Sequence, residues 1–295
     1  MSLILNQDKF RSAVLELIRR TSTDLSPDVV TAIAEARDSE EENSGARGVL
    51  TAILKNIDRA REKSTPICQD TGTNIYYITI PEGFSMRRVS EIVYSATREA
   101  TEKGYLRPNA VDPVTGKNSG DNTGFMSPDI HFEEWDEPAI RVRLILKGGG
   151  CENVSVQYTL PDTSLNAGRD LEGVYRCVLD AVVMAQGKGC APGILGVGVG
   201  GDRSTGTITA KKQLLRKLDD VNSDPELARL ESRLLADLNT LGIGPMGFGG
   251  KTTALAVKLG KAHRLPASFF VSVSYMCWAD RRKSMTFSGS EAVYD

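Results

Sequence analysis

Three of the five cysteines in this sequence stand in settings where a thiol could ligate a metal. Cys68 lies in STPICQDTGT, Cys190 in GKGCAPGILG, and Cys277 in SYMCWADRR, so each lies next to a turn or at the end of an apolar segment. A thiolate at the end of an element can face a cavity, and three of them could share one metal site. The alternative is that all three are small buried side chains, the commonest fate of a free cysteine.

The other two cysteines and the overall count narrow this choice. Cys177 lies in GVYRCVLDAVVMA, an amphipathic helical pattern, so we expect a core side chain there. Cys151 follows three glycines and could also face a site. The composition of its surrounding sequence does not distinguish it from Cys68, Cys190 and Cys277. The count is odd and no CxxC pair occurs, which excludes a disulfide framework, a zinc ribbon and a ferredoxin-type run.

Three glycine-rich segments could bind a ligand through backbone amides. GVGVGG (196–201) matches the GxGxxG of dinucleotide folds, but the motif alone is weak evidence, since its glycines run on into DRSTGTIT and a cysteine lies just before the strand. GPMGFGGKTT ends like a phosphate-binding P-loop, yet Pro245 replaces its first glycine and a strand pattern follows. A nucleotide hydrolase is therefore rejected, although this turn could still hold an anion with Lys251 and backbone amides. In KGGG (147–150), the glycines form either a ligand-facing turn or a tight bend.

Apolar periodicity and turn residues predict a mixed α/β (α+β) fold. We expect helices over 8–20, 28–40, 46–63, 86–103, 171–186, 205–218 and 225–241, and strands over 74–80, 139–146, 193–199, 254–259 and 269–275. Residues 108–128, rich in Gly, Asn and Asp, are expected to form one long loop. The predicted organisation is a single domain over 1–295, with a helical region over 1–65 and an α/β region over 66–295.

Composition limits the partners and the compartment. The 295 residues carry a formal net charge of −2, with 40% hydrophobic and 25% charged residues and no basic run. Nucleic acid and a membrane surface are therefore not expected as partners. The first 20 residues are too polar for a signal peptide, and no apolar run approaches the roughly 20 residues of a membrane span. We expect a cytoplasmic protein.

Five segments, taken together and in order, resemble the α subunit of the class I fumarases and L(+)-tartrate dehydratases, the iron–sulfur hydro-lyases. They are PICQDTGT, KGGG, GCAPGILGVGVGG, GPMGFGGKTTALAV and PASFFVSVSYMCWADRR. The resemblance implies a 4Fe–4S cluster held by Cys68, Cys190 and Cys277, so that 66–295 would be the cluster-binding region. A cluster with three protein ligands leaves one iron open, which can act as a Lewis acid on a 2-hydroxy acid.

The resemblance also implies roles for residues around the cluster. Gln69 and Asp70 adjoin a cluster ligand and would contact substrate. Asp70 is a candidate for proton transfer, and the alternative is that its carboxylate only caps the turn. Arg107, in GYLRPNAV, matches an arginine that grips a substrate carboxylate. Lys147 and the glycines that follow match a turn that contacts substrate (Gly148, Gly149 and Gly150).

One position departs from the pattern. The family places a histidine twelve residues before the third cysteine, where this sequence has Leu265. His263 lies two residues earlier, and we take it as the catalytic candidate. His131, among acidic residues, is expected to be solvated or structural.

The resemblance further implies a partner, because a second module completes the family's active site and no segment here matches it. We therefore expect a β subunit in an α2β2 assembly, acting on a small dicarboxylic acid. The leading reaction is the interconversion of fumarate and (S)-malate; dehydration of tartrate to oxaloacetate and a methyl-substituted fumarate are close alternatives. Two other classes stay open: a nucleotide- or anion-binding protein with incidental cysteines, and a non-catalytic scaffold for the β subunit.

Overall fold

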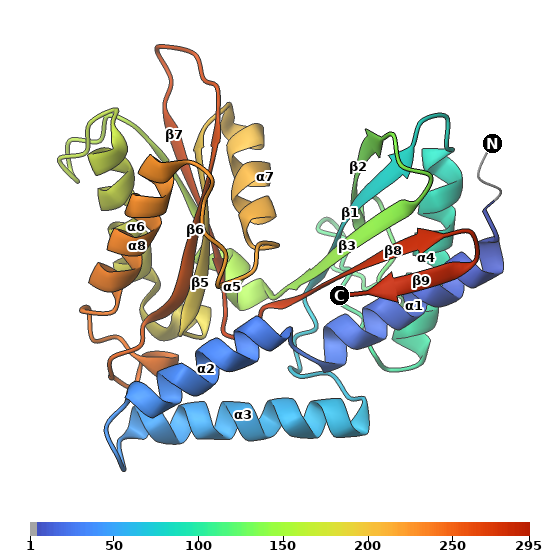
Figure 1. Cartoon of the computed structure of the whole chain (residues 1–295), viewed down its shortest axis with the longest axis horizontal. Coiled ribbons are helices and arrows are strands. Elements are labelled where there is room, and N and C mark those ends of the chain that lie inside the picture. Colours follow the sequence, from blue (N-terminus) through green and yellow to red (C-terminus); the bar gives the residue numbers. More distant parts are fainter. Residues whose placement is uncertain (1–4) are drawn as a thin grey trace. The chain divides into compact units, whose positions relative to one another are not determined.

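The computed structural model describes residues 5–295, which form two compact units (Figure 1). The first unit comprises residues 5–26, 56–148 and 281–295, and the second comprises 27–55 and 149–280. Helices and two mixed sheets confirm the predicted fold class. The single domain predicted over 1–295 stays a prediction. Among the described residues, none of the helices has the length and apolarity that a membrane span requires.

The first unit is built on a five-stranded sheet with the order β2-β1-β3-β8-β9. Its strands are β1 (Thr73–Pro81), β2 (Asp129–Trp135), β3 (Ile140–Lys147), β8 (Arg281–Ser288) and β9 (Glu291–Tyr294). β1 runs parallel to β2 and antiparallel to β3, which is antiparallel to β8. Helices α1 (Gln7–Thr23) and α4 (Met86–Glu102) pack together, and their apolar sides join the sheet in one core that includes Phe10, Tyr76 and Phe287.

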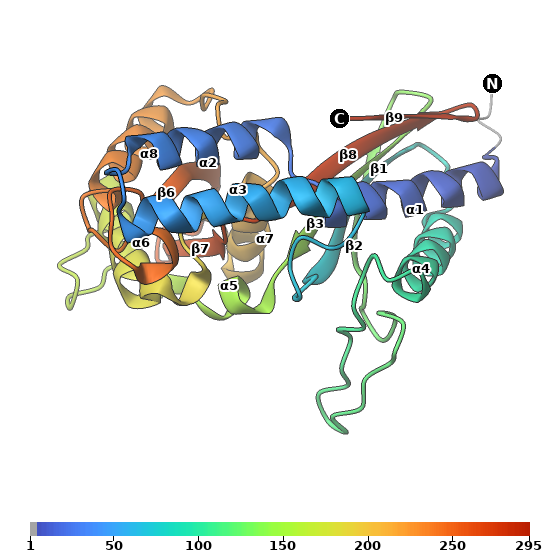
Figure 2. The same cartoon turned by 90° about the horizontal axis from the view of Figure 1, so that it is seen from below.

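The second unit is built on a four-stranded sheet with the order β4-β7-β5-β6. Its strands are β4 (Val156–Thr159), β5 (Gly193–Gly200), β6 (Ala254–Ala262) and β7 (Phe270–Met276). β5 runs parallel to β6 and antiparallel to β7. Helix α7 (Arg203–Gln213) covers one face, and α6 (Leu171–Ala185) and α8 (Pro225–Leu238) lie on the other (Figures 1 and 2).

The glycines of the GVGVGG segment serve packing in this unit. A Cβ at Gly196 would lie 2.1 Å from the carbonyl oxygen of Ala210, and one at Gly198 would lie 2.2 Å from that of Gly206. Both glycines lie inside β5, so the bare strand lets α7 approach the sheet closely. The motif is therefore a helix–strand contact, and the structure gives no support to a dinucleotide-binding turn.

Three further elements are helical. Helix α2 (Pro27–Ser39) belongs to the second unit, as does the five-residue α5 (Gly149–Asn153), while α3 (Gly45–Lys63) begins in the second unit and belongs to the first from residue 56 on. All seven predicted helices are present. α5 and the strands β2, β4, β8 and β9 had not been predicted, since they are short or rich in polar residues.

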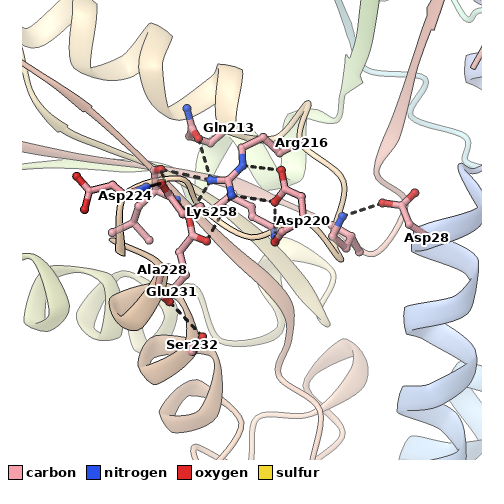
Figure 3. Close-up of polar contacts among 12 residues, drawn as sticks. Asp28, Gln213, Arg216, Asp220, Asp224, Ala228, Glu231, Ser232 and Lys258 are labelled. Carbon is pink, nitrogen blue, oxygen red and sulfur yellow. Dashed lines mark hydrogen bonds and ion pairs between the residues drawn. The ribbon is translucent and has the colours of Figure 1, made fainter. Parts of the chain in front are cut away.

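A polar network joins α8, β6 and the chain after α7 in the second unit (Figure 3). The Arg216 guanidinium donates to Glu231 at 2.7 Å and to Asp220 at 2.8 and 2.9 Å, and the Lys258 ammonium donates to Asp220 at 2.7 Å. Each buried charge therefore faces an opposite one, as burial requires.

Candidate active site

The segment that carries Cys68 leads into β1 and is held in place on both sides. The Ile67 amide donates to the Ser22 carbonyl at 3.0 Å, and its own carbonyl accepts from the Asn56 side chain at 2.9 Å. Asp70 Oδ1 accepts from the Gly72 amide at 2.8 Å, so the turn-capping role weighed for this carboxylate is present. The half-buried Cys68 and Asp70 thus lie in a fixed turn at the start of the strand.

Gly72 is required for this turn to meet β3. Its φ is +80°, and a Cβ there would lie 2.6 Å from the carbonyl carbon of Lys147. Lys147 itself is the last residue of β3, pairs with Thr73 and is buried. The predicted substrate lysine is therefore placed beside the Cys68 turn, at one end of the five-stranded sheet.

Arg281, at the start of β8, lies at the same end of the sheet and was missed as a site residue. Its side chain is 1% exposed, and its Nη1 donates to the Asp70 carbonyl at 2.5 Å. Its Nε is buried and has no hydrogen-bond partner among residues 5–295. The two arginines directly after the Cys277 segment were the available signal, because charged residues at the end of an apolar strand are uncommon.

Arg107 joins this group through its backbone. Its amide donates to Thr71 Oγ1 at 3.1 Å, while its side chain is exposed. The first unit thus brings Arg107, Lys147 and Arg281 to the turn that carries Cys68 and Asp70. Three basic residues next to one turn give this end of the sheet the positive charge that would suit an anion.

The segments that carry Cys190 and Cys277 lie side by side in the second unit. Cys190 precedes β5 and Cys277 follows β7, and these antiparallel strands pair Ile194 with Met276. The Trp278 amide also donates to the Cys190 carbonyl at 3.3 Å. Both cysteines are half-buried, at the same end of the four-stranded sheet.

Tyr275 shapes the turn around Cys190. A Cβ at Gly189 would lie 2.5 Å from the Tyr275 ring, and one at Gly193 would lie 2.5 Å from the phenol oxygen, so the ring fills both spaces. Burial raises the pKa of Tyr275, and the thiols of Cys277, Cys151 and Cys190 raise it further. The buried Tyr275 ring therefore packs against the glycines on both sides of Cys190.

The two cysteines not expected as ligands are both buried. Cys177 lies inside α6, as predicted, where burial raises the pKa of its thiol to about 12 and so disfavours the thiolate. Cys151 lies in α5, with its Sγ 3.9 Å from the Sδ of Met276.

The glycine-rich turn that includes Lys251 already holds an anion from within the chain. The buried Glu40 carboxylate accepts hydrogen bonds from the Lys251 amide at 2.9 and 3.0 Å and from the Thr252 amide at 2.9 Å. The Lys251 ammonium donates to the Ser39 carbonyl at 3.2 Å. The Lys251 and Thr252 amides are therefore not open to a substrate anion, because Glu40 occupies them, while a substrate contact of the Lys251 side chain stays a prediction.

His263 lies far from the cysteines of its own unit. It follows β6, whose last residue pairs with Gly200 at the end of β5, whereas Cys190 precedes the start of β5. The eight-residue β5 separates the two ends by roughly 23 Å at about 3.3 Å per residue. The expected catalytic role of His263 does not fit this placement.

The KGGG segment is a strand end followed by a helix, and not an open turn. Lys147 ends β3, and Gly149 and Gly150 are the first residues of α5. The substrate contacts expected of Gly148, Gly149 and Gly150 stay predictions.

In the described part of the chain, no three His, Cys, Asp or Glu side chains converge to hold a metal ion. Cys68 belongs to the first unit and the other two cysteines to the second, so the three-cysteine site also stays a prediction.

A family model described as "Fumarate hydratase (Fumerase)" matches residues 11–286. The chain belongs to the fumarate hydratase family. The matched span includes every cysteine and every residue of the candidate site.

Three relatives extend this comparison. A Geobacillus stearothermophilus protein named "Putative fumarate hydratase class I" is 50% identical over 280 residues, which are 93% of this chain and 54% of that protein. The chain therefore spans about half the length of that fumarate hydratase relative. A Methanocaldococcus jannaschii protein named "Putative L(+)-tartrate dehydratase subunit alpha" is 37% identical over 93% of this chain and 96% of its own. The "L(+)-tartrate dehydratase subunit alpha" of Escherichia coli K12 is 30% identical over 94% and 90%.

Proposed function

We propose that this chain is the α subunit of a hydro-lyase that interconverts fumarate and (S)-malate. The observation that carries the proposal is the group of Arg107, Lys147 and Arg281 around the turn of Cys68 and Asp70, at one end of one sheet. Membership of the fumarate hydratase family supports the reaction type.

The cofactor we propose is a 4Fe–4S cluster held by Cys68, Cys190 and Cys277. All three are half-buried thiols at element ends, and thiolates are the ligands that iron–sulfur clusters take. The adjacent turns of Cys190 and Cys277 fit a shared ligand set, and ligation by Cys68 as well would draw on both units. Bound by three cysteines, such a cluster supplies an open iron as a Lewis acid for the leaving hydroxide.

The protein side chains would bind and orient the acid and move its proton. The Arg107 guanidinium, planar and exposed, suits one carboxylate of the substrate through paired hydrogen bonds. Lys147 and Arg281 add positive charge where the second carboxylate would lie. The Asp70 carboxylate, which accepts from the Gly72 amide, would carry a proton, and the Gln69 amide would hydrogen-bond the substrate.

We propose a β subunit as the partner, in an α2β2 enzyme. Two relatives are named α subunits, and the Geobacillus relative is nearly twice as long as the matched region. In an enzyme of two subunits, the partner would supply the region that corresponds to the remaining part of that protein. Substrate contacts beyond those of Arg107, Lys147 and Asp70 would then come from the second chain.

The experiment is to purify the chain anaerobically with its partner and to assay fumarate, L(+)-tartrate and methyl-substituted fumarate. We expect the highest kcat/KM for fumarate and (S)-malate, since the relative named for fumarate is 50% identical and the E. coli tartrate enzyme 30%. A preference for tartrate would overturn the substrate assignment, and turnover of none would overturn the hydro-lyase. A non-catalytic scaffold predicts that Asp70→Asn and Arg107→Ala leave the activity of the complex unchanged.

A further inference from the structure

Arg107 is held by a network of buried side chains that its proposed role in substrate binding does not explain. The network starts at Thr71, a fully buried residue directly after Asp70. Thr71 Oγ1 accepts from the Arg107 amide at 3.1 Å and from the Asn109 side chain at 3.0 Å. One hydroxyl therefore ties the Arg107 backbone to the turn of Cys68 and Asp70.

Asn122 holds the other side of the same peptide. Its side chain is 3% exposed and uses both of its polar atoms. The Nδ2 donates to the Arg107 carbonyl at 2.7 Å and to Thr101 Oγ1 at 2.9 Å, and the Oδ1 accepts from the Asn109 amide at 2.8 Å. Thr101 lies in α4, so Asn122 links Arg107 to the helix that packs on this sheet.

These bonds fix the arginine backbone and leave its guanidinium available. Both the N–H and the C=O of Arg107 are bonded to buried side chains, and Pro108 restricts the backbone angles of the residue before it. The guanidinium is exposed and makes no hydrogen bond or ion pair with any of residues 5–295. A rigid backbone beneath an unpaired charged group is the arrangement that a ligand-binding arginine needs.

Asn122 comes from a distant part of a long, exposed loop. The chain between α4 and β2 extends away from its sheet before returning to it (Figure 2). Asn122 lies near the return, with φ +62°, a left-handed conformation that Asn adopts more readily than most residues. The loop therefore contacts the Arg107 carbonyl through the Asn122 side chain, and the Asn118 side chain donates to the next carbonyl, that of Pro108, at 2.8 Å.

We propose that Asn122 is a positioning residue that, with Thr71, holds Arg107 against the Asp70 turn for binding a substrate carboxylate. This inference rests on the proposed function, since Arg107 has its role only there. Asn122→Asp keeps the size of the side chain and its tolerance of positive φ. It replaces the donor to the Arg107 carbonyl by a second acceptor, and two facing oxygens repel.

The test compares Asn122→Asp with Asn43→Asp, an exposed asparagine away from this loop that also has a positive φ, +63°. In the anaerobic complex, we expect Asn122→Asp to lower kcat/KM by about 10- to 100-fold, mainly through KM, and Asn43→Asp to change it less than about twofold. In an Arg107→Ala background, Asn122→Asp should cause no further loss. Unchanged kcat/KM in the single variant, or the same loss in both backgrounds, would overturn the proposal.

Hydrogen exchange of the purified chain separates this proposal from the proposed function. We expect faster amide exchange over 107–109 in Asn122→Asp, with α1 and β1 protected as in the wild type. Unchanged exchange over 107–109 would overturn the positioning role whatever the activity. If Asn122→Asp exchanges faster over 107–109 but the complex turns over none of the acids, the hydro-lyase proposal is contradicted. The positioning role of Asn122 then still holds.

Discussion

The Glu40 carboxylate binds the Lys251 amide at 2.9 and 3.0 Å and closes the glycine-rich turn from inside the chain. Gly250 permits this contact, because a Cβ there would lie 2.9 Å from Glu40 Oε2. The turn resembles a phosphate-binding loop in its last residues and still binds an anion, but the anion is a side chain that follows α2. Its role is structural: it fastens the end of α2 to the start of β6.

Replacing Glu40 should therefore cost stability. In Glu40→Gln, an NH2 group faces backbone N–H donors, so we expect the free energy of unfolding to fall by about 2 kcal/mol. Glu41→Gln, one residue later and exposed, is the control and should change it by less than about 0.5 kcal/mol. Urea unfolding of both variants and the wild type measures these differences. A Glu40→Gln variant as stable as the wild type would show that the amides do not need the carboxylate.

Gly193 should not tolerate a side chain. Its Cβ would lie 2.5 Å from the ring of Tyr275, which is 1% exposed and cannot move aside, so we expect Gly193→Ala to destabilise the chain by about 3 kcal/mol. Gly48→Ala is the control: Gly48 lies in α3 with nothing within 4 Å, and alanine should stabilise that helix slightly. Thermal unfolding of the two variants should move in opposite directions. A stable Gly193→Ala would contradict the packing of Tyr275 on the Cys190 turn.

The ion pairs of Asp220 predict a dependence of stability on pH (Figure 3). Burial raises the pKa of Asp220, but hydrogen bonds from Arg216 and Lys258 outweigh burial and hold the pKa below the ordinary value of 3.8. The carboxylate thus stabilises the fold above about pH 4, and this contribution is lost as the pH falls through the lowered pKa.

Asp220→Asn should accordingly be less stable than the wild type by about 1 to 2 kcal/mol at pH 7. The difference should begin to shrink below about pH 4, where the carboxyl of the unfolded wild-type chain takes up a proton, and it should be smallest below the lowered pKa of the folded chain, where the carboxyl is neutral in both states. Asp219→Asn, exposed and adjacent, should differ little from the wild type at any pH. Urea unfolding between pH 7 and 3 measures this, and a difference that grows toward low pH would contradict the ion pairs.

His263 should be dispensable for catalysis. It lies at the end of the second sheet opposite to Cys190, so we expect His263→Ala to keep kcat/KM of the anaerobic complex within about twofold. Asp70→Asn, in the turn of Cys68, should lower kcat by about 100-fold or more if it moves a proton. A loss in His263→Ala as large as that in Asp70→Asn would restore the histidine to the active site.

The helices could be predicted because their apolar residues recur at helical spacing, as in α1 and α8. The strands β2 and β8 could not, since DIHFEEW and RRKSMTFS are polar segments that take their place from neighbouring strands. Arg281 and Arg282 in β8 are buried, against the usual preference of arginine for the surface.

Only part of the candidate site could be predicted, because the position of a residue in a sheet depends on strand pairing. A sequence shows that Cys68, Cys190 and Cys277 lie at element ends, but it does not show which end of a sheet each residue reaches. Cys190 precedes β5 and His263 follows β6. Only the parallel pairing of β5 and β6, which the sequence does not show, places these two residues at opposite ends of the sheet. The role of Glu40 depends on a partner more than 200 positions away, for which no local signal exists.

Iron and sulfide content after anaerobic reconstitution tests the proposed cluster most directly. The wild-type chain with its partner should hold about four iron and four sulfide ions per α chain, and Cys68→Ala, Cys190→Ala and Cys277→Ala should each lose the intact cluster. Cys177→Ala, buried inside α6, should retain it. A wild-type complex without iron, or a Cys190→Ala complex with the full content, would contradict the three-cysteine site.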